Sequence, residues 1–483
     1  MRNIFLILLT TLSLTSQAQS GISWSPTEQV ASSAFDNMHP RITIDGSGNP
    51  LILWGKGDVN KVYFTRRENN SFAPPLTLNP DAIPVFAASW AGPDLAAHGD
   101  TVYAVFKHTP EHLNSIYLVT STDGGATFST PVQVDSIADN LSRFPSVGTD
   151  AAGNPLIAFM KFDPNWGNAR YVLTRSADLG QTFEPDILGS AWSGGDVCDC
   201  CPSTVVTSGN TVALMYRDNL NNLRNNWTGI SLDNGASFAG GIEIDNTDWM
   251  INACPSSGPD GIIVGDKLHS VFMSSASGKT LCYRSSSTIS TLQMDSISPL
   301  TANFQGLGLQ NFPRIASWGN SAAIVWAQSV NGSSQLALQF TNNLSNGFPD
   351  TYETVIGNGV VNADVALYGD KIYVVWEDNS ATLKFKSGTF MLSGTSGPET
   401  AQQAMRIFPN PATGNLLRCV FEDKNDIMTA YEVVNVQGQV IDSGLAQTPE
   451  GILQAELTTN FTGVCFVRAW RNSTVHLSRV VIP

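Results

Sequence analysis

The sequence Ser121-Thr122-Asp123-Gly124-Gly125-Ala126-Thr127-Phe128 recurs in two further versions, SADLGQTF at 176–183 and SLDNGASF at 231–238. The three octads start 55 residues apart. In each, the Asp carboxylate can accept backbone N–H bonds within a turn, a glycine supplies a positive φ, and the aromatic residue can pack beneath a hairpin. The octads therefore predict a repeated strand–turn–strand unit with a structural role for its aspartates, which are Asp123, Asp178 and Asp233.

The repeated unit extends beyond the octads. From Gly21 to about Phe390 strand patterns dominate and helical periodicity is nearly absent. Successive copies begin near Pro40, Pro93, Pro145, Pro202, Pro259, Pro313 and Ala363. Their spacing of 50 to 57 residues suits the four-stranded blades of a β-propeller. The sequence thus predicts an all-β chain with seven blades; because the fifth and sixth copies are the most degenerate, six blades is the alternative.

The two ends of this repeat region predict how the ring closes. The last copy lacks a convincing outer strand, whereas a spare strand at Trp24–Val30 precedes the first copy. Pairing the spare strand with the last sheet would give hydrogen-bond partners to two exposed edges. We expect the ring to close in this way.

The charge balance excludes some classes of partner. The 483 residues include 26 Lys and Arg against 41 Asp and Glu, which gives a formal charge of −15. Broad binding to nucleic acid or to anionic membranes needs an excess of basic residues, so neither is expected. No Gly-rich phosphate loop occurs, His108 and His112 share a loop without helical context, and the sequence predicts no cofactor and no metal.

The start of the chain predicts export. Met1-Arg2-Asn3 is followed by an apolar run at 4–14 and by small residues at Ser16 and Ala18. This order is typical of a signal peptide, which we place at 1–18. No later segment reaches about 18 apolar residues, so no membrane span is predicted. Cysteines exported from the cytoplasm tend to form disulfides.

The octads resemble the Asp box, or bacterial neuraminidase repeat, of sialidases and related propellers, and this resemblance covers residues 22–392. Sialidases cleave terminal sialic acids with an arginine triad, a Tyr nucleophile assisted by Glu, and an Asp. The resemblance therefore implies an exo-sialidase-like glycoside hydrolase. Arg41, Arg143 and Arg314 lie beside blade-start prolines, where a triad would fit. No Tyr–Glu pair can be placed by spacing, so the catalytic residues stay unassigned, and arginines that pair with loop acids are the alternative.

The face opposite the octads is expected to carry the blade-start loops and the ends of the second strands. The charged residues at those positions are Arg41, Lys56, Asp94, Lys107, Arg143, Lys161, Arg217, Asp218, Asp260, Arg314, Asp364, Glu377 and Asp378. Seven of these thirteen are basic, and a basic concave mouth favours an anionic ligand. The expected ligand is an acidic glycan or another anionic small molecule. The predicted ligand-binding residues are Arg41, Asp94, Arg143, Lys161, Arg217, Arg314, Asp364 and Glu377.

Four cysteines form the most unusual pattern. Cys198, Cys200 and Cys201 lie in one heptapeptide, and Cys254 follows 53 residues after Cys201. Cys201-Pro and Cys254-Pro occupy similar places at the starts of adjacent blades, so they should be neighbours. The pattern resembles that of exported bacterial propellers described as sialidase-like. Four thiols allow three pairings, among which spacing does not choose, and a thiolate site for Cu(I) is the alternative to disulfides.

After a linker at 393–403 the pattern changes. Residues 404–483 are β-rich and contain Phe-Pro-Asn-Pro at 408–411, Asn-Val-Gln-Gly at 435–438 and Gly-Val-Cys-Phe-Val at 463–467. These motifs resemble the type A C-terminal sorting domain of type IX secretion, a small β-sandwich. The resemblance implies the type IX secretion machinery as a partner and passage through an outer membrane, followed by secretion or attachment to the cell surface. A carbohydrate-binding sandwich is the alternative. Cys419 and Cys465 could pair or could each fill the core.

Three functions follow for the predicted propeller. It could bind and hydrolyse a glycan at its central face, it could bind a glycan or a protein without catalysis, or it could carry a thiol or copper site on the cysteines. The missing Tyr–Glu pair slightly favours binding without catalysis.

Overall fold

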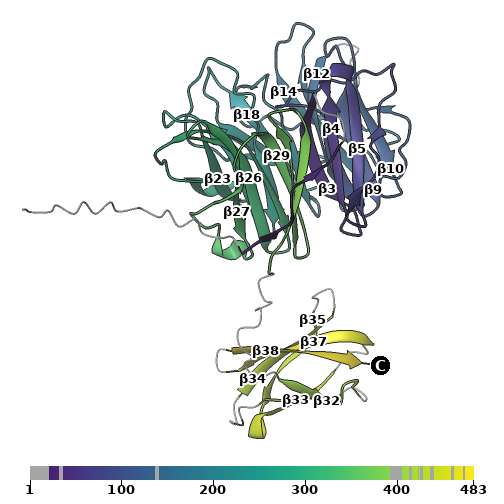
Figure 1. The fold of residues 1–483 in the computed structure, drawn as a ribbon, viewed down its shortest axis with the longest axis vertical. Coiled ribbons are helices and arrows are strands. Elements are labelled where there is room, and N and C mark those ends of the chain that lie inside the picture. Colours follow the sequence, from purple (N-terminus) through teal and green to yellow (C-terminus); the bar gives the residue numbers. More distant parts are fainter. Residues whose placement is uncertain are drawn as a thin grey trace, which may run out of the picture. The chain divides into compact units, whose positions relative to one another are not determined.

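The computed structural model describes residues 21–31, 36–135, 141–391, 405–412, 416–421, 424, 428–435, 440–457, 462–471 and 474–482. The chain divides into two compact units, Met1–Thr395 and Ser396–Pro483 (Figure 1). The predicted signal peptide at 1–18 and the predicted linker at 393–403 lie outside the described residues.

The prediction of a nearly all-β chain is confirmed. The helical segments of the described residues are three short 3-10 turns, η1 (Gly57–Val59), η2 (Leu344–Asn346) and η3 (Pro449–Gly451). Within these described residues, no helix has the length and apolar character needed to cross a membrane.

Seven antiparallel sheets of four or five strands make up the described part of the first unit. The first three sheets are β3 (Asn37–Ile44), β4 (Pro50–Lys56), β5 (Lys61–Glu68), β6 (Ser71–Phe72) and β7 (Leu76–Thr77); β8 (Asp94–His98), β9 (Thr101–Lys107), β10 (Ile116–Ser121) and β11 (Val132–Gln133); and β12 (Leu141–Thr149), β13 (Pro155–Phe162), β14 (Arg170–Arg175) and β15 (Ile187–Leu188). The fourth and fifth are β16 (Asp196–Val197), β17 (Thr204–Ser208), β18 (Thr211–Asn219), β19 (Asn226–Ser231) and β20 (Gly240–Glu243); and β21 (Asp260–Val264), β22 (Lys267–Ser274), β23 (Leu281–Thr288) and β24 (Gln293–Pro299). The last two are β25 (Leu307–Trp318), β26 (Ser321–Val330), β27 (Ser333–Thr341) and β28 (Glu353–Ile356); and β29 (Val360–Tyr368), β30 (Lys371–Asp378) and β31 (Leu383–Thr389) with β1 (Ser23–Trp24) and β2 (Glu28–Gln29).

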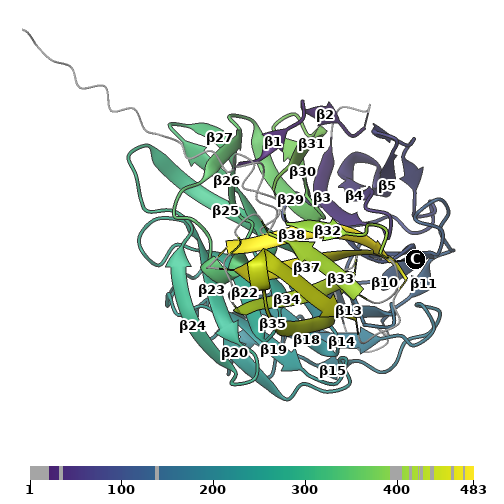
Figure 2. The same ribbon diagram turned by 90° about the horizontal axis from the view of Figure 1, so that it is seen from below.

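The sheets follow one another around a common centre (Figure 2). Contacts between their first strands run from β3 through β8, β12, β17, β21 and β25 to β29, and β29 in turn contacts β3. The N-terminal strands complete the last sheet, because Trp24 pairs with Gly388 and Glu28 pairs with Phe385 of β31. The prediction that the N-terminal strand completes the last sheet is therefore confirmed.

The second strand of each sheet forms most of the core. In β4, Leu51, Ile52, Leu53 and Trp54 are buried, as is the run of residues 322–326 in β26. Such continuous apolar runs are typical of strands covered on both faces, here by the two neighbouring sheets. The core is thus shared between adjacent sheets, and the first strands are left to line the centre, which we call the hub.

The three octads are the turns between the third and fourth strands of the sheets that begin with β8, β12 and β17. In the first octad, Asp123 Oδ1 accepts the backbone N–H of Thr127 at 2.9 Å and the hydroxyl of Ser121 at 2.7 Å. Gly125 has φ 82°, and a Cβ there would lie 2.5 Å from the ring of Phe64. The other two aspartates accept matching bonds, Asp178 from Thr182 and Asp233 from Ser237. The contacts agree with the predicted structural role.

We expect these turns to make stability depend on pH in acid. Hydrogen bonds from Thr127 and Thr182 lower the pKa of Asp123 and Asp178, each to about 2. An unfolded Asp has a pKa near 3.9, so the stabilisation is complete above about pH 4 and is lost as the pH falls through about 2. The thermal midpoint of the double variant Asp123→Asn, Asp178→Asn should fall less between pH 4 and pH 2 than that of the parent. Equal falls would contradict this assignment.

The second unit has two sheets. One contains β32 (Arg406–Phe408), β33 (Leu416–Val420) and β36 (Ile452–Glu456), and the other β34 (Met428–Asn435), β35 (Val440–Gln447), β37 (Gly463–Arg471) and β38 (Thr474–Ile482). Cys419 and Cys465 are buried in its core as free thiols, so each fills core space and they do not pair. The Asn-Val-Gln-Gly motif continues from the end of β34 beyond the described residues.

Candidate functional site

Three of the first strands carry a bulge beside their blade-start proline. The pairing register shifts within β3, β12 and β25, in each case beside the blade-start proline. The residues before these prolines, His39, Phe144 and Phe312, have positive φ values of 55°, 48° and 50°. Aromatic side chains seldom adopt this conformation, and β-bulges commonly redirect side chains near functional sites. The bulges precede Arg41 in β3 and Arg314 in β25.

Arg41 and Arg314 form a charged group with three aspartates, which we call the hub ion group. Arg41 Nε lies 3.6 Å from Asp94, and Arg314 Nε lies 3.4 Å from Asp260 and 3.1 Å from Asp364. All five side chains are at most 20% exposed. Charges this deeply buried require such pairing. Two arginines and three aspartates leave the group without excess positive charge.

The aspartates of the hub ion group also join neighbouring sheets. Each accepts a backbone N–H from the first strand of the next sheet. The pairs are Asp94 with Val147 at 2.9 Å, Asp260 with Ile315 at 2.9 Å, and Asp364 with Ile42 at 3.0 Å. Two predicted ligand-binding residues, Asp94 and Asp364, therefore have a structural role as well.

Burial and pairing shift the titration of this group. Burial, followed by repulsion from Arg314, lowers the pKa of Arg41 to about 10. Burial opposes the charge of Arg314, but Asp260 and Asp364 raise its pKa above the usual value. Burial and then Arg41 hold the pKa of His39 well below its usual value. At neutral pH both arginines are therefore charged and His39 is neutral.

A two-residue turn reaches the hub from the segment before β8. Its bridging residues, Ala88 and Ala91, exchange backbone hydrogen bonds of 2.7 and 3.2 Å. Ser89 donates its hydroxyl to Glu377 Oε1 at 2.7 Å, and the Asn362 amide donates to the carbonyl of Ser89. Glu377, a predicted ligand-binding residue, thus holds this turn in place.

Aromatic rings continue from the turn along the edge of the hub. Trp90 packs edge-on against Phe144, with ring centroids 5.3 Å apart. The Arg143 guanidinium lies 4.4 Å from the ring centroid of Phe144 and 5.7 Å from that of Trp166. Trp166 is 43% exposed. We call Trp90, Phe144 and Trp166, with Arg143 between the last two, the aromatic rim.

A cavity of about 50 Å³ lies at the hub. Its polar and aromatic lining includes His39, Arg41, Ser89, Trp90, Arg314 and Asn362. A cavity of this size holds one or two water molecules or one hydroxyl group of a larger ligand. Among the described residues, two arginines and no Tyr or Glu line it. The arginine triad and Tyr–Glu pair of the sialidase resemblance are not assembled there.

The predicted basic residues do not form an uncompensated positive surface. Arg143 Nε lies 3.0 Å from Glu111, and Lys161 Nζ lies 2.7 Å from Asp186. Both acids lie outside the positions considered from the sequence. The count of basic residues that predicted an anionic ligand therefore overstates the positive charge of this face.

Arg217 has a structural position. Its side chain is fully buried, and its Nε, Nη1 and Nη2 atoms donate to backbone carbonyls at 2.7 to 3.1 Å. The acceptors belong to Ser257, Arg224 and Met273. Because all three nitrogens are engaged, Arg217 is not available to bind a ligand as predicted.

Sequence reasoning missed Ser89, Trp90, Asn362 and Trp166. Trp90 and Trp166 lie outside the long strands, where strand periodicity carries no signal. Only the residue type could have identified them, because a large aromatic side chain in a predicted loop is often part of a binding site.

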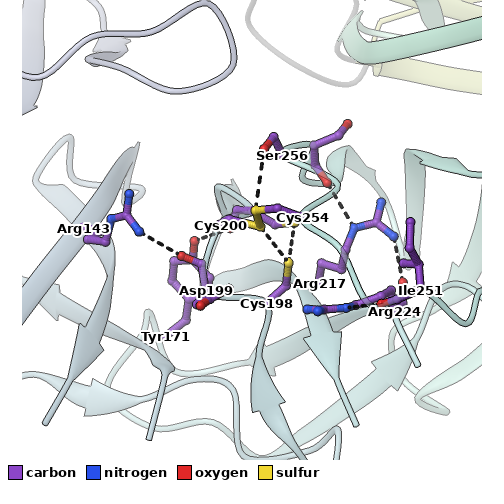
Figure 3. Close-up of a disulfide and its surroundings, with 12 residues drawn as sticks. Arg143, Tyr171, Cys198, Asp199, Cys200, Arg217, Arg224, Ile251, Cys254 and Ser256 are labelled. Atoms are coloured by element: carbon purple, nitrogen blue, oxygen red, sulfur yellow. Dashed lines mark hydrogen bonds between the residues drawn. A yellow bond between two sulfur atoms is a disulfide. The ribbon is translucent and has the colours of Figure 1, made fainter. Parts of the chain in front are cut away.

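The cysteines lie beside the hub, because Pro202 and Ser203, which follow Cys201, line the hub cavity. Figure 3 shows Cys198, Cys200 and Cys254 close together. Cys198–Cys201 belong to the loop between β16 and β17, where the first strand of the fourth sheet is interrupted. Cys200 forms a disulfide with Cys254, with a Cα–Cα distance of 6.1 Å. This disulfide joins the loops before β17 and β21, so these two blade starts are neighbours as expected, and Cys198 and Cys201 are free thiols. Cys282 is a buried residue of β23.

A larger cleft, of about 680 Å³, lies between the sheets that begin with β21 and β25. Its walls include Arg284, Phe348 and several serines, of which Ser270 and Ser285 have buried hydroxyls without a partner among the described residues. Its volume is in the range of small-molecule sites.

No protein-family model matches the chain, and no curated protein matches it. A protein of unknown function from Dyadobacter fermentans has 10% identity and a TM-score of 0.45 over 77% of this chain and 100% of its own. An α-L-arabinanase from Penicillium chrysogenum, solved with arabinobiose, has 10% identity and a TM-score of 0.42 over 76% and 99%. A puromycin hydrolase has 12% identity and a TM-score of 0.49 over 84% and 62%. Similarities this weak carry no argument about activity.

Proposed function

We propose that the first unit is a seven-bladed, sialidase-like β-propeller that binds a glycan on the face formed by the hub ion group and the aromatic rim. The circular order of contacts between the first strands supports the seven-bladed ring. The observation that carries the binding proposal is the position of an exposed tryptophan, Trp166, and an arginine–aromatic stack beside paired Arg and Asp side chains. Aromatic faces pack on the apolar faces of sugar rings, and paired donors and acceptors suit sugar hydroxyls.

The size of the hub cavity limits how the glycan would bind. A space of about 50 Å³ is too small for a sugar ring, so the ring would lie on the aromatic rim and place one hydroxyl in the cavity. The three aspartates of the hub ion group outnumber its two arginines, which favours uncharged hydroxyls over a carboxylate. The proposed ligand is therefore a neutral glycan, in place of the acidic glycan predicted from the sequence.

The lining of the cavity favours binding over hydrolysis. Retaining glycosidases need a nucleophile and an acid that converge on the scissile bond. No Tyr or Glu lines the cavity among the described residues, and the three aspartates of the hub ion group are paired with arginines and backbone N–H groups.

We expect Trp166→Ala to weaken glycan binding at least tenfold. The matched control is Trp318→Ala, because Trp318 is also 43% exposed but lies at the end of β25 remote from Arg314. Binding to a glycan array identifies the ligand, calorimetric titration gives the dissociation constants, and a hydrolysis screen should find no turnover. Equal weakening by both substitutions, or release of sugar, would refute the proposal.

The 680 Å³ cleft is the second candidate site for a glycan. Its volume favours it, because it could enclose a sugar ring whereas the hub cavity could not. The hub remains the first choice because it combines the exposed aromatic ring, the paired charges and the bulged strands. The variant Arg284→Ala, on the wall of the cleft, should leave glycan affinity unchanged.

We further infer export in two stages, with a signal peptide at 1–18 and a type IX sorting domain of type A at 404–483. The motifs of the second unit and its two-sheet arrangement support the sorting assignment. Expression in a host with type IX secretion tests it. The full chain should reach the medium or the cell surface starting near Gln19, and a chain ending at residue 395 should stay inside the outer membrane. Export of the shortened chain would contradict the assignment.

A further inference from the structure

The sulfur atoms of the four cysteines beside the hub form a continuous chain of contacts, from Cys201 through Cys198 and Cys200 to Cys254. Cys198 Sγ is 2.6 Å from Cys201 Sγ and 3.6 Å from Cys200 Sγ, and Cys200 is bonded to Cys254 (Figure 3). A thiol pair therefore lies directly against a disulfide. Exchange proceeds by attack of a thiolate on a disulfide sulfur, and here the attacking and receiving atoms are already in contact.

The two pairs differ in exposure. Cys198 and Cys201 are fully buried, whereas Cys254 is exposed. A thiol from solution can therefore reach the disulfide at Cys254, but it cannot reach the buried pair directly. The buried pair communicates with the outside only through Cys200.

The surroundings favour Cys198 as the thiolate. The hydrogen bond from the Cys201 thiol, together with attraction from Arg217 and Arg224, lowers the pKa of Cys198 to about 7 although burial opposes this. Burial holds the pKa of Cys201 well above its usual value, so Cys201 keeps its proton. The titratable and charged groups that face Cys198 are Cys201, Arg217, Arg224 and Tyr171.

We propose that Cys198, Cys200, Cys201 and Cys254 form a thiol–disulfide exchange relay whose outside partner is a thiol that reaches Cys254. In the first step the Cys198 thiolate attacks Cys200 Sγ, the Cys198–Cys200 bond forms, and Cys254 leaves as a thiolate. In the second step Cys201 attacks Cys198 Sγ, the Cys198–Cys201 bond forms, and Cys200 leaves. The proton of Cys201 ends on one of the two released sulfurs. Two electrons pass from the buried pair to the outer pair, and the internal exchange needs no further oxidant or reductant.

The same distances argue against a metal in this arrangement. Cys200 is engaged in the disulfide, which leaves Cys198 and Cys201 as thiol ligands. A tetrahedral zinc–thiolate site with bonds of about 2.3 Å separates its sulfurs by roughly 3.8 Å. The observed 2.6 Å leaves no room for an ion between them.

The test of the relay uses the full chain. It is titrated with dithiothreitol until two of the four relay cysteines are free thiols and the other two share one disulfide. Free thiols are then alkylated with iodoacetamide and the disulfides are mapped by mass spectrometry of unreduced peptides. We expect two isomers, one with Cys200–Cys254 and one with Cys198–Cys201. With iodoacetamide in excess, so that exchange limits the rate, alkylation of Cys254 should speed up as the pH rises and level off once Cys198 is ionised, at a pH below the usual range for a thiol, because the Cys198 thiolate is the nucleophile.

Two variants separate the steps. Cys198→Ser removes the attacking sulfur, so Cys254 alkylation should fall at least tenfold and Cys200–Cys254 should persist. Cys201→Ser blocks only the second step, so a Cys198–Cys200 disulfide should accumulate. Cys282→Ser, in the core of another sheet, is the control and should behave as the parent. Unchanged Cys254 alkylation in Cys198→Ser, a single isomer in the parent at every pH, or four free thiols with bound metal would each overturn the relay.

Discussion

A chain carrying Arg217→Met should be destabilised by about 3–5 kcal/mol, because three buried backbone carbonyls lose their donor at about 1–3 kcal/mol each. Arg217 is fully buried and its guanidinium holds three backbone carbonyls, those of Ser257, Arg224 and Met273. A methionine keeps similar bulk but cannot donate, so these carbonyls lose a charged donor. Urea unfolding monitored by tryptophan fluorescence measures the decrease in the free energy of unfolding.

The control for this variant is Arg66→Met. Arg66 pairs with Glu68 near the surface, so its replacement should change the free energy of unfolding by less than about 1 kcal/mol. Arg217→Met should also raise the pKa of Cys198, since Arg217 is one of the groups that lower it. If Arg217→Met lowers the free energy of unfolding by less than about 1 kcal/mol, the three hydrogen bonds of Arg217 do not stabilise the fold.

Removing the N-terminal strands should destabilise the first unit by about 3–6 kcal/mol and promote aggregation. In a chain that starts at Asp36, β31 loses its pairing with β1 and β2, including the hydrogen bonds of Ser25 with Ser387 and of Val30 with Leu383. The buried side chains of Ile22 and Val30 are also lost, and burying each contributes about 1.5–3 kcal/mol. The exposed edge of β31 then becomes available to another chain.

The comparison chain starts at Gln19. The variant Gln29→Ala in that longer chain removes an exposed polar side chain of β2 but keeps its backbone pairing, and should cost less than about 1 kcal/mol. Urea unfolding and light scattering measure both effects. If the chain that starts at Asp36 unfolds at the same urea concentration as the longer chain, the N-terminal strands do not stabilise the ring.

Local patterns in the sequence predicted most of the fold. The octads predicted three turns because their hydrogen bonds connect residues within four positions of one another, as Asp123 and Thr127 do. The spare strand at 24–30 and the missing strand of the last copy predicted the closure. The number and spacing of strands follow from such short-range signals.

The candidate site was less predictable because its contacts connect residues far apart in sequence. Glu111 neutralises Arg143, and Asp186 neutralises Lys161, but no spacing rule relates these positions. The position of Trp90 at the hub depends on a bond between Ser89 and Glu377, 288 residues apart. The pairing of Cys254 with Cys200 likewise depends on the path of two loops that sequence spacing does not determine.

The most direct test of the glycan-binding account is a crystal structure of the protein with the glycan selected by the array. The account predicts the sugar ring on Trp166 and Trp90 with one hydroxyl beside Arg314 in the hub cavity. Electron density for the sugar in the cleft beside Arg284 and Phe348, with an empty hub, would contradict it.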